Sequence, residues 1–434
     1  MGGESLGLRR STKGNTEYLV KSRFVLLKWT NQSDQWQTCM ENQGQKGNGN
    51  VHSDSSSPSS EPLPRKEYPL TRGILELSDK GFGFLRQEAK NYQPSKDDVF
   101  VNPNVARELQ LREGLLLEGE MVPTNRGGHE VMNITKINGL KLDRYKKTRQ
   151  FNDLTVIDPI EPFHLETDAT TVSTRCLDLF CPIGKGTRGL IVSPPRAGKT
   201  VLLKQIANAI SANHPEVDLM IMLVDERPEE VTDFHRSTKG EVFASSNDEE
   251  LKSHVRLPKL VIEMAKRKVE YGRDVVILMD SLTRMARAFN NYGNNSGRTM
   301  SGGLDSRAME IPRKIFAAAR NAEEGGSLTI LATILVDTGS RMDELIFQEF
   351  KGTGNMELVL DRGMAERRIF PAIDLYKSGT RKEEKLLPAD VLNKVHLLRR
   401  ELAGRNPTEA TESIVRAMQK TKANAELLNM LAKV

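Results

Sequence analysis

The stretch GLIVSPPRAGKT, residues 189–200, joins a short apolar strand to a glycine-containing turn. Leu190-Ile191-Val192 is typical of a buried parallel strand, and apolar residues from Val201 to Ile210 recur at helical spacing directly after Gly198-Lys199-Thr200. Strand, tight turn, Gly-Lys-Thr and helix together predict a phosphate-binding loop. One departure is that this chain has Ser193 where the usual pattern has a glycine.

The predicted loop has a definite chemistry. Backbone N–H groups and the start of a helix attract phosphate oxygens. We expect Lys199 to reach the β- and γ-phosphates of ATP, and the Thr200 hydroxyl to bind Mg²⁺. The alternative is a chance Gly-Lys-Thr at the start of a helix, which the preceding strand and the following helix disfavour.

Composition sets the class of protein. The chain has 434 residues, of which 38% are hydrophobic and 28% charged, which suits a globular protein of two or three domains. No run of 18 apolar residues predicts a membrane span, and the first residues lack the apolar core of a secretory signal. The three cysteines fit a reducing cytoplasm, so we expect a cytoplasmic protein without a membrane partner. A net charge of +5 is too small to indicate nucleic-acid binding by itself.

The pattern divides the chain into four segments. Residues 1–65 are rich in Gly, Asn, Ser and Pro, which predicts a disordered tail. Residues 66–140 contain short strands at regular spacing, which predicts a small all-β barrel. Residues 141–173 are expected to form a connector. Residues 174–434 alternate strands with helices, for example at 258–271 and 312–321, which predicts an α/β domain with a parallel sheet.

The barrel segment carries the motif GFGFLR. Phe82 and Phe84 are two residues apart, so both rings face one side of a strand. Such rings stack on nucleic-acid bases, each contributing roughly 1–3 kcal/mol. Arg86 continues that face toward a base edge or a phosphate, and Phe100 could add a third ring. The motif resembles a cold-shock-like RNA-binding barrel, an OB-fold. The alternative is that both rings belong to the core.

Two carboxylates follow predicted strands of the α/β domain. Asp280 ends the apolar run 275–279, which is the Walker B arrangement for holding Mg²⁺. Glu226 follows a strand that ends at Val224, and ligands of open α/β sheets lie beyond the carboxyl ends of strands. Glu226 is therefore expected to orient or deprotonate the attacking water. A surface salt-bridge cluster is the alternative for this acidic segment.

Other segments leave two interpretations open. The loops at 290–306 and 337–344 carry Arg298 and Arg341 and suit a phosphodiester backbone, but exposed loops without a partner would look the same. The basic run 144–149 is either an RNA contact or a solvated face. The arginines of 367–384 are either an arginine finger for a neighbouring subunit or a local salt-bridge network with Glu383 and Glu384.

The order of these motifs resembles the bacterial transcription termination factor Rho family over about Tyr68 to Val434. The motifs that carry the resemblance are GFGFLR, PIGKGTRG, PPRAGKT, LVDERPEE, VVILMDSLTR, DTGSRMDE, FKGTGNMEL, RRIFPAID and SGTRKEE. The resemblance implies a homohexamer ring with a RecA-like ATPase core. It also implies a helicase that uses ATP and Mg²⁺ to thread single-stranded RNA and to release the nascent transcript from RNA polymerase.

The resemblance also implies roles for individual residues. Glu226 becomes the catalytic carboxylate, Arg227 a gate near the phosphates, and Arg381 the finger given to the adjacent subunit. Phe370 would pack on adenine, Arg368 would lie near the same interface as Arg381, and Arg298 and Arg341 would lie on RNA-binding pore loops. The remaining ATP-binding residues implied are Gly184, Lys185, Gly186, Thr187, Arg188, Gly189, Arg196, Ala197, Gly198, Lys199, Thr200 and Val201.

Three departures from the family pattern matter. Residues 1–65 show no clear copy of the family's small helical domain, Arg196 and Arg341 replace lysines, and HEVMN stands where a late barrel strand usually has an aromatic. Two other functions compete with an RNA motor. A rotary ATP synthase-like subunit shares the GKGTRG turn, but the barrel and the loops argue against it. A non-motor RNA-binding regulator is disfavoured by intact Lys199, Glu226, Asp280 and Arg381.

Overall fold

The computed structural model describes residues 68–125, 127–293, 303–305 and 307–431. All of these residues belong to one unit of the chain, Lys66–Val434. The predicted tail of residues 1–65 and the predicted RNA contact Arg298 lie outside the described residues.

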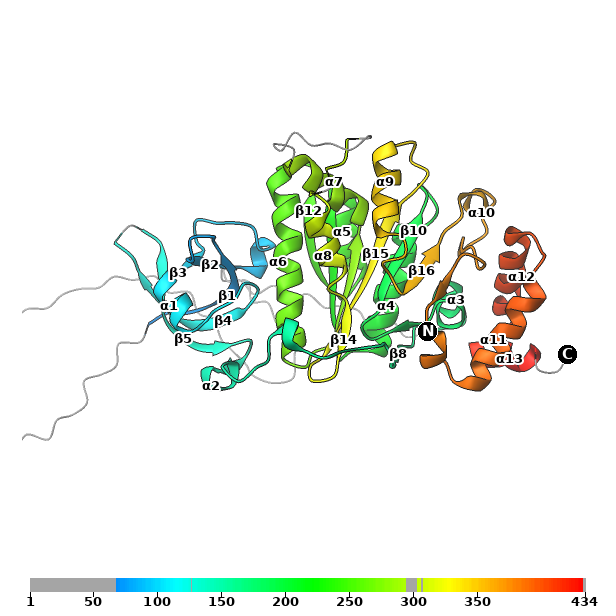
Figure 1. The fold of residues 1–434 in the computed structure, drawn as a ribbon, viewed down its shortest axis with the longest axis horizontal. Coiled ribbons are helices and arrows are strands. Elements are labelled where there is room, and N and C mark those ends of the chain that lie inside the picture. The colour runs from blue at the N-terminus through cyan, green and yellow to red at the C-terminus, as the bar shows by residue number, and fades with distance from the viewer. Residues whose placement is uncertain (1–67, 126, 294–302, 306, 432–434) are drawn as a thin grey trace, which may run out of the picture. The chain divides into compact units, whose positions relative to one another are not determined.

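A six-stranded antiparallel sheet forms the first part of this unit (blue and cyan in Figure 1). Its strand order is β3-β2-β1-β4-β5-β6, and a further pairing of Phe100 with Glu130 joins β3 to β5 and closes the barrel. Leu75, Leu85 and Leu117 are at most 1% exposed, because alternate residues of each strand face the interior. The prediction of an OB-type barrel is confirmed. The elements are β1 (Leu70–Leu77), β2 (Gly83–Arg86), β3 (Val99–Val101), α1 (Pro103–Glu108), β4 (Leu116–Pro123), β5 (His129–Ile137), β6 (Leu140–Lys141) and α2 (Leu142–Tyr145).

A nine-stranded sheet forms the second part, with the strand order β12-β11-β13-β15-β10-β16-β17 and with β14 and β7 attached to β15. The pairings from β12 to β16 are all parallel, as predicted. The strands are β7 (Val156–Ile157), β10 (Arg188–Ser193), β11 (Asp218–Glu226), β12 (Glu241–Ser246), β13 (Val275–Asp280), β14 (Arg320–Ala322), β15 (Ser327–Leu335), β16 (Met356–Val359) and β17 (Gly379–Thr380). A separate pair consists of β8 (Pro162–Phe163) and β9 (Ile183–Gly184).

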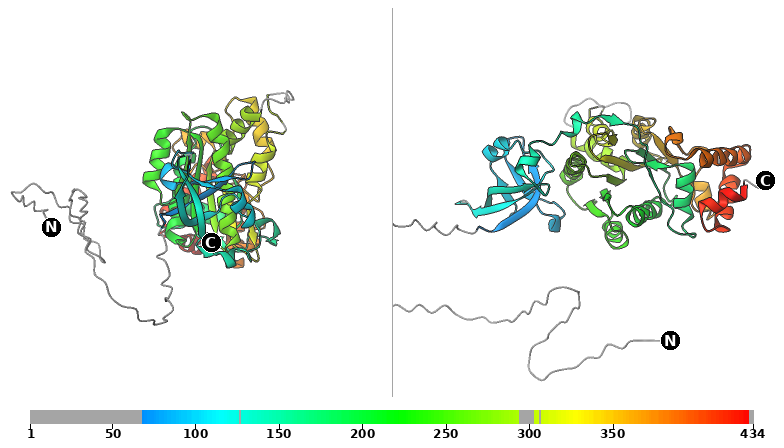
Figure 2. Two further views of the ribbon diagram at one scale, coloured as in Figure 1. Left: turned by 90° about the vertical axis from the view of Figure 1, so that its left-hand side faces the viewer. Right: turned by 90° about the horizontal axis from the view of Figure 1, so that it is seen from below.

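Helices cover both faces of this sheet (Figures 1 and 2). Ile191 and Leu219 pack in one cluster with residues of α4, whereas their neighbours Leu190 and Met220 pack in a second cluster with residues of α6 and α7. A strand that is buried on both faces has a continuous apolar sequence, as β10 and β11 have here. The helices are α3 (Val172–Phe180), α4 (Lys199–Asn213), α5 (Pro228–Ser237), α6 (Leu251–Glu270), α7 (Leu282–Gly293), α8 (Glu310–Phe316), α9 (Arg341–Phe350), α10 (Arg362–Glu366), α11 (Ala389–Leu402), α12 (Pro407–Gln419) and α13 (Asn424–Leu431).

Two helix boundaries differ from the prediction. The helix expected over 258–271 begins earlier, at Leu251, and contains Pro258 within it. The helix expected over 312–321 ends at Phe316, and Arg320–Ala322 forms β14 instead. This strand exists because Asn321 pairs with Ser327 on one side and Ile157 of the connector on the other. Such tertiary pairing overrides a local helical pattern.

A buried ion pair joins the barrel to α6. Arg112 donates to both carboxylate oxygens of Glu270, at 2.6 and 2.7 Å, and the backbone N–H of Phe151 donates to Glu270 at 2.7 Å. The Glu270 side chain is 0% exposed. Its three hydrogen bonds therefore replace the water that burial removes.

Replacing Glu270 by Ala should lower the free energy of unfolding by about 3–5 kcal/mol, because it leaves the Arg112 guanidinium without its partner. Urea unfolding of the full chain measures this loss. Glu310→Ala removes an acid whose pair with Lys314 is 60–72% exposed, and solvent screening should make its effect far smaller. Equal losses in the two variants would contradict a structural role for the buried pair.

Candidate active site and aromatic platform

The predicted phosphate-binding loop has the geometry that its sequence requires. It leaves the end of β10 at Ser193 and enters α4 at Lys199. Gly198 has a φ of 92°, a conformation that glycine adopts without strain. Ser193 is fully buried and donates to the Pro194 carbonyl at 2.9 Å, so a small hydroxyl side chain is accommodated where a glycine was expected.

Lys199 and Asp280 meet at the carboxyl edge of the sheet. Lys199 Nζ forms an ion pair with Asp280 Oδ1, which also accepts a hydrogen bond from Thr333 Oγ1 at 2.9 Å. These residues come from α4, β13 and β15, and Asp280 is 0% exposed. The parallel direction of the strands thus brings the phosphate-binding lysine and the Walker B carboxylate together, as the sequence predicts.

The predicted metal ligands fit Mg²⁺. Within residues 68–125, 127–293 and the described part of 303–431, Asp280 Oδ2 is buried and has no hydrogen-bond partner, and Thr200 Oγ1 forms a 3.3 Å bond to Glu230 Oε2. In the described part of the chain, no group of three or more His, Cys, Asp or Glu side chains could hold a metal ion alone. Mg²⁺ commonly binds through one or two protein oxygens together with substrate phosphates, and a free carboxylate oxygen beside the phosphate-binding loop suits that mode.

Glu226 lies beside this pair with the properties of a base. It is 1% exposed, and its Oε2 has no hydrogen-bond partner among the residues that the structure describes. Burial, and next the negative charge of Asp280, raise the pKa of Glu226. Arg284 Nη2 lies 3.4 Å from Oε1, and the backbone N–H of Arg227 donates to the same oxygen at 3.1 Å. The carboxyl is therefore held by one oxygen while the other remains free to accept a proton.

Arg284 was not predicted from the sequence. It also donates to the backbone carbonyl of Asp225, which has a φ of 56° and lies at an irregularity of β11. The only sequence signal for Arg284 is its position, four residues after Asp280 at the start of α7. The side chain of Arg227, which was predicted to act as a gate, is exposed.

A cavity of about 280 Å³ adjoins the phosphate-binding loop. Arg196, Ala197 and Gly198 line one side, and Phe370 lines the other. A Cβ on Gly198 would lie 3.6 Å from the Phe370 ring. Val201 does not belong to the buried face of α4: it is 61% exposed and faces this cavity, as does Phe370, which is 46% exposed. Two exposed apolar side chains beside the loop suit the predicted contact with a base.

The GKGTRG turn, residues 184–189, lies at the opposite end of β10. Arg188 starts the six-residue strand and Ser193 ends it, which separates turn and loop by about 20 Å at about 3.3 Å per residue. Lys185 lies 2.7 Å from Glu161 and 2.9 Å from Asp274. The structure therefore does not bring this group of predicted ATP-binding residues to the phosphate-binding loop of the same chain.

The predicted finger Arg381 lies beside that turn. Thr380 pairs with Met356, and Met356 pairs with Gly189 at the start of β10. Arg381 and Arg188 line one cavity of about 260 Å³. Of the two acids that could have neutralised Arg381 locally, Glu383 instead contacts His396 at 2.9 Å, and no ion pair of Arg381 is found among the described residues. Arg368, also predicted near this interface, is exposed and follows α10.

The three predicted aromatic rings form one platform on the barrel. The ring centroids of Phe82, Phe84 and Phe100 lie 5.7–5.8 Å apart. All three side chains are partly exposed, whereas Leu85, on the other side of β2, is 0% exposed. The rings are thus outside the core, in the arrangement that base stacking requires.

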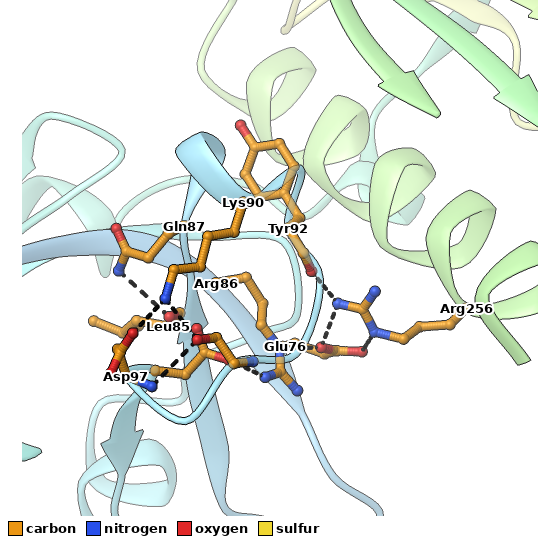
Figure 3. Close-up of polar contacts among 10 residues, drawn as sticks. Glu76, Leu85, Arg86, Gln87, Lys90, Tyr92, Asp97 and Arg256 are labelled. Carbon is orange, nitrogen blue, oxygen red and sulfur yellow. Dashed lines mark hydrogen bonds and ion pairs between the residues drawn. The ribbon is translucent and has the colours of Figure 1, made fainter. Parts of the chain in front are cut away.

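Arg86 stands at the edge of the platform but is already engaged. Its guanidinium lies 5.1 Å from the Phe84 centroid and forms ion pairs with Glu76 and Asp98. Figure 3 shows Glu76 held between Arg86 and Arg256, which reaches it from α6. Asp98 was missed from the sequence; it is 6% exposed, and its ion pair with Arg86 holds that guanidinium beside the rings.

Arg341 is exposed at the first position of α9, beyond the carboxyl end of β15. The preceding loop is tied to α7, because Arg287 and Thr338 both donate to Asp343 at 2.7 Å. Arg341 therefore lies at the same edge of the sheet as Lys199, and its loop contacts α7, the helix that follows Asp280.

This fold and this site define a RecA-like ATPase that carries an OB-type barrel. Residues 173–380 match the ATP synthase alpha/beta family, nucleotide-binding domain, and residues 71–143 match the Rho termination factor, RNA-binding domain. A transcription termination factor Rho from Cereibacter sphaeroides is 50% identical over 83% of this chain and 86% of its own length. A second, from Bacillus subtilis, is 49% identical over 85% and 86%.

The chain belongs to the transcription termination factor Rho family. It is an ATP-hydrolysing enzyme with an RNA-binding domain. A prototypical ATPase from a type III secretion system has a TM-score of 0.53 at 21% identity, over 71% of this chain and 94% of its own. That likeness shows the fold alone. An ATP synthase subunit from Nanoarcheaum equitans, with a TM-score of 0.50 at 19% identity over 59% of this chain and 64% of its own, is likewise related only by fold. Among the described residues, the structure contains no helix with the length and apolarity needed to cross a membrane.

Glu226→Gln should slow ATP hydrolysis by roughly 10²–10⁴-fold, the usual contribution of a general base.

The same variant should be more stable than wild type at neutral pH without nucleotide, because a buried carboxylate beside Asp280 is lost. The difference should shrink as the pH falls through the raised pKa and vanish below the ordinary pKa of 4.5, where the carboxyl is protonated in both the folded and the unfolded chain. Urea unfolding across this range measures it; a difference independent of pH would contradict the raised pKa.

Replacing Phe82 and Phe84 by Ala should weaken binding of single-stranded RNA by roughly 2–6 kcal/mol, since two stacking contacts are lost. The thermal midpoint should hardly change, because both rings are partly exposed. Leu85→Ala is the matched control: it should lower stability by about 2–5 kcal/mol and leave the platform in place. Fluorescence anisotropy measures the RNA affinity, and thermal unfolding measures the stability. A double variant that is destabilised but binds RNA with unchanged affinity would contradict the assignment of these rings to an RNA-binding platform.

Proposed function

We propose that this chain is an RNA-dependent ATPase and helicase that acts as a homohexamer ring in the bacterial cytoplasm. It uses ATP and Mg²⁺ to move along single-stranded RNA and releases the nascent transcript from RNA polymerase, which terminates transcription. Membership of the Rho family supports the overall activity. The ring is supported by the position of two groups of predicted nucleotide-site residues at opposite edges of the sheet.

That separation is the observation on which the ring depends. Lys199 and Asp280 lie at the carboxyl edge of the sheet, whereas Arg381 lies at the amino end of β10, beside Arg188. An Arg side chain does not span about 20 Å of strand, so if Arg381 contacts a nucleotide, that nucleotide would be bound by another copy. Repeated head-to-tail contacts of this kind close into a ring when the rotation permits.

The chemistry follows from the residues at the carboxyl edge. Lys199 neutralises the γ-phosphate, and Thr200 and Asp280 hold Mg²⁺, which when bound neutralises charge on the phosphates. The free Oε2 of Glu226 accepts a proton from the attacking water, while Arg284 and the Arg227 N–H keep the carboxyl oriented. The neighbour's Arg381 would stabilise the charge that develops in the transition state.

RNA contacts the chain at two places in this proposal. Phe82, Phe84 and Phe100 hold bases on the barrel, and Arg341, with Arg298, contacts the backbone in the pore. The loop of Arg341 reaches the catalytic acids through α7, which carries both Arg287, paired with Asp343, and Arg284, paired with Glu226. RNA in the pore can therefore change the position of the acids and make hydrolysis depend on RNA.

ATP turnover should rise when a C-rich single-stranded RNA is added, and Lys199→Ala should remove it, with a loss on the order of 10²–10³ in rate. Arg341→Ala should still bind RNA through the barrel but lose the stimulation. The Phe82→Ala, Phe84→Ala variant should show the reverse, with stimulation recovered at high RNA concentration. Turnover that is the same with and without RNA would count against an RNA-driven motor and favour an ATPase of another class.

A further inference from the structure

Three arginines gather at the amino end of the sheet. Arg188 starts β10, Arg320 starts β14 and Arg381 follows β17. The pairings of Arg188 with Ile330 and of Arg320 with Leu328 place the first two beside the same end of β15. Arg381 shares a cavity with Arg188. Of the three, Arg320 has no role in the proposed function.

The guanidinium groups of this cluster bind backbone carbonyls. Each guanidinium donates to a backbone carbonyl: Arg188 to Thr353 at 2.6 Å, Arg320 to Ala318 at 3.2 Å and Arg381 to Gly352 at 3.5 Å. Within the described residues, none of them forms an ion pair with a carboxylate. Asp158 lines the same cavity, but Lys382 and Lys385 hold its carboxylate at 2.9 and 2.7 Å.

Three like charges without a counter-charge destabilise one another. The pKa of Arg188 is lowered by burial first, then by the charge of Arg320 and of Arg381. An arginine remains protonated under such conditions, because its pKa is far above neutral. The cluster therefore gains free energy from any anion that enters it, and the planar guanidinium is well matched to phosphate oxygens.

The GKGTRG turn fixes Arg320 in place. A Cβ on Gly186 would lie 2.3 Å from the Asn321 nitrogen and 2.6 Å from the Arg320 carbonyl carbon, so only glycine allows β14 to approach. The Arg320 guanidinium also lies 4.4 Å from the Phe151 ring centroid. The turn thus fixes the backbone of Arg320, and Phe151 restrains its guanidinium before any ligand binds, which lowers the entropy cost of binding.

We propose that Arg188, Arg320 and Arg381 form one anion site that receives the triphosphate bound by a neighbouring copy, with Arg320 as its third cation. This inference rests on the proposed ring. The inference also gives the GKGTRG turn a role, although the turn is too far from the nucleotide of its own chain to contact it. Gly186 of this turn lets β14 approach, and this sets the spacing between Arg188 and Arg320. The occupant is a nucleoside polyphosphate, because its charge is carried on several oxygens that three guanidinium groups can share.

The test uses Arg320→Met, which keeps an aliphatic side chain against Phe151 and removes the charge. Pure wild-type rings and pure variant rings are compared for ATP turnover, with assembly verified by native mass. We expect turnover to fall on the order of 10²-fold through kcat, as for loss of one electrostatic stabiliser, and Arg320→Lys to recover part of it. Arg273→Met is the matched control, since Arg273 lies at the same edge but pairs with Asp218 at 2.9 Å; its turnover should be unchanged.

Mixed rings decide where Arg320 acts. Subunits with Arg320→Met are exchanged with subunits carrying Lys199→Ala, so that some interfaces combine an intact Lys199 with an intact Arg320. Activity should recover at intermediate ratios. Normal turnover of the pure Arg320→Met ring, or no recovery in confirmed mixed rings, would overturn the proposal, because a structural role would confine the defect to the subunit's own fold.

A parallel mixture of Arg381→Ala subunits with Lys199→Ala subunits distinguishes failure of the proposed ring from failure of the role proposed for Arg320. Recovery there without recovery for Arg320→Met leaves the ring intact and removes Arg320 from the site. No recovery in either mixture overturns the ring itself.

If Arg320→Met does not assemble, Arg320→Gln replaces it in the same mixtures, and failure of both neutral variants to assemble would make Arg320 a structural residue. A defect confined to assembly, with normal turnover in assembled rings, would instead indicate a neighbour's carboxylate as the occupant.

Discussion

The parallel direction of five strand pairings is the constraint on which the rest of the structure depends. It places the loop after β10, Glu226 after β11 and Asp280 at the end of β13 along one edge, because parallel strands all end on the same side. The same constraint places everything that precedes a strand at the other edge. Arg188, Arg320 and Arg381 therefore lie at the opposite edge of the sheet from Lys199.

Both edges hold charge that the isolated chain does not neutralise. At one edge, Glu226 and Asp280 are buried beside each other and each has an unpartnered oxygen, with Lys199 and Arg284 as the nearby cations. At the other edge, Arg188, Arg320 and Arg381 lack acids among the described residues. Buried polar groups without partners cost free energy. In the proposed ring, a metal-bound triphosphate between two copies would supply cation to the acids and anion to the arginines, so ligand binding and subunit contact would stabilise the same groups.

The sequence predicted what depends on short-range pattern. The phosphate-binding loop and the strand before Asp280 follow from residue spacing within one element and have the expected local structure, whereas of the two predicted rings only Phe84 lies in β2 and Phe82 directly precedes it. It did not predict β14, because Arg320–Ala322 becomes a strand only by pairing with β15 and with the distant connector strand β7. Arg284 and Asp98 were missed for the same reason, since their roles depend on which residues the fold brings near. The alternatives left open for Arg381 also needed the fold, because Glu383 lies two residues away and yet contacts His396.

The barrel and the ATPase part are joined by a carboxylate that the RNA platform also uses. Glu76 lies between Arg86, whose guanidinium rests against the Phe84 ring, and Arg256 of α6 (Figure 3). Burial alone would raise the pKa of Glu76, but the hydrogen bonds and charges of the two arginines lower it. The folded state therefore favours the ionised form, and the contact is retained above the pKa of the unfolded chain and weakens as the pH falls through the lowered value. One carboxylate thus accepts hydrogen bonds from an arginine of the barrel and from an arginine of α6. The platform and α6 are thus coupled through a single side chain.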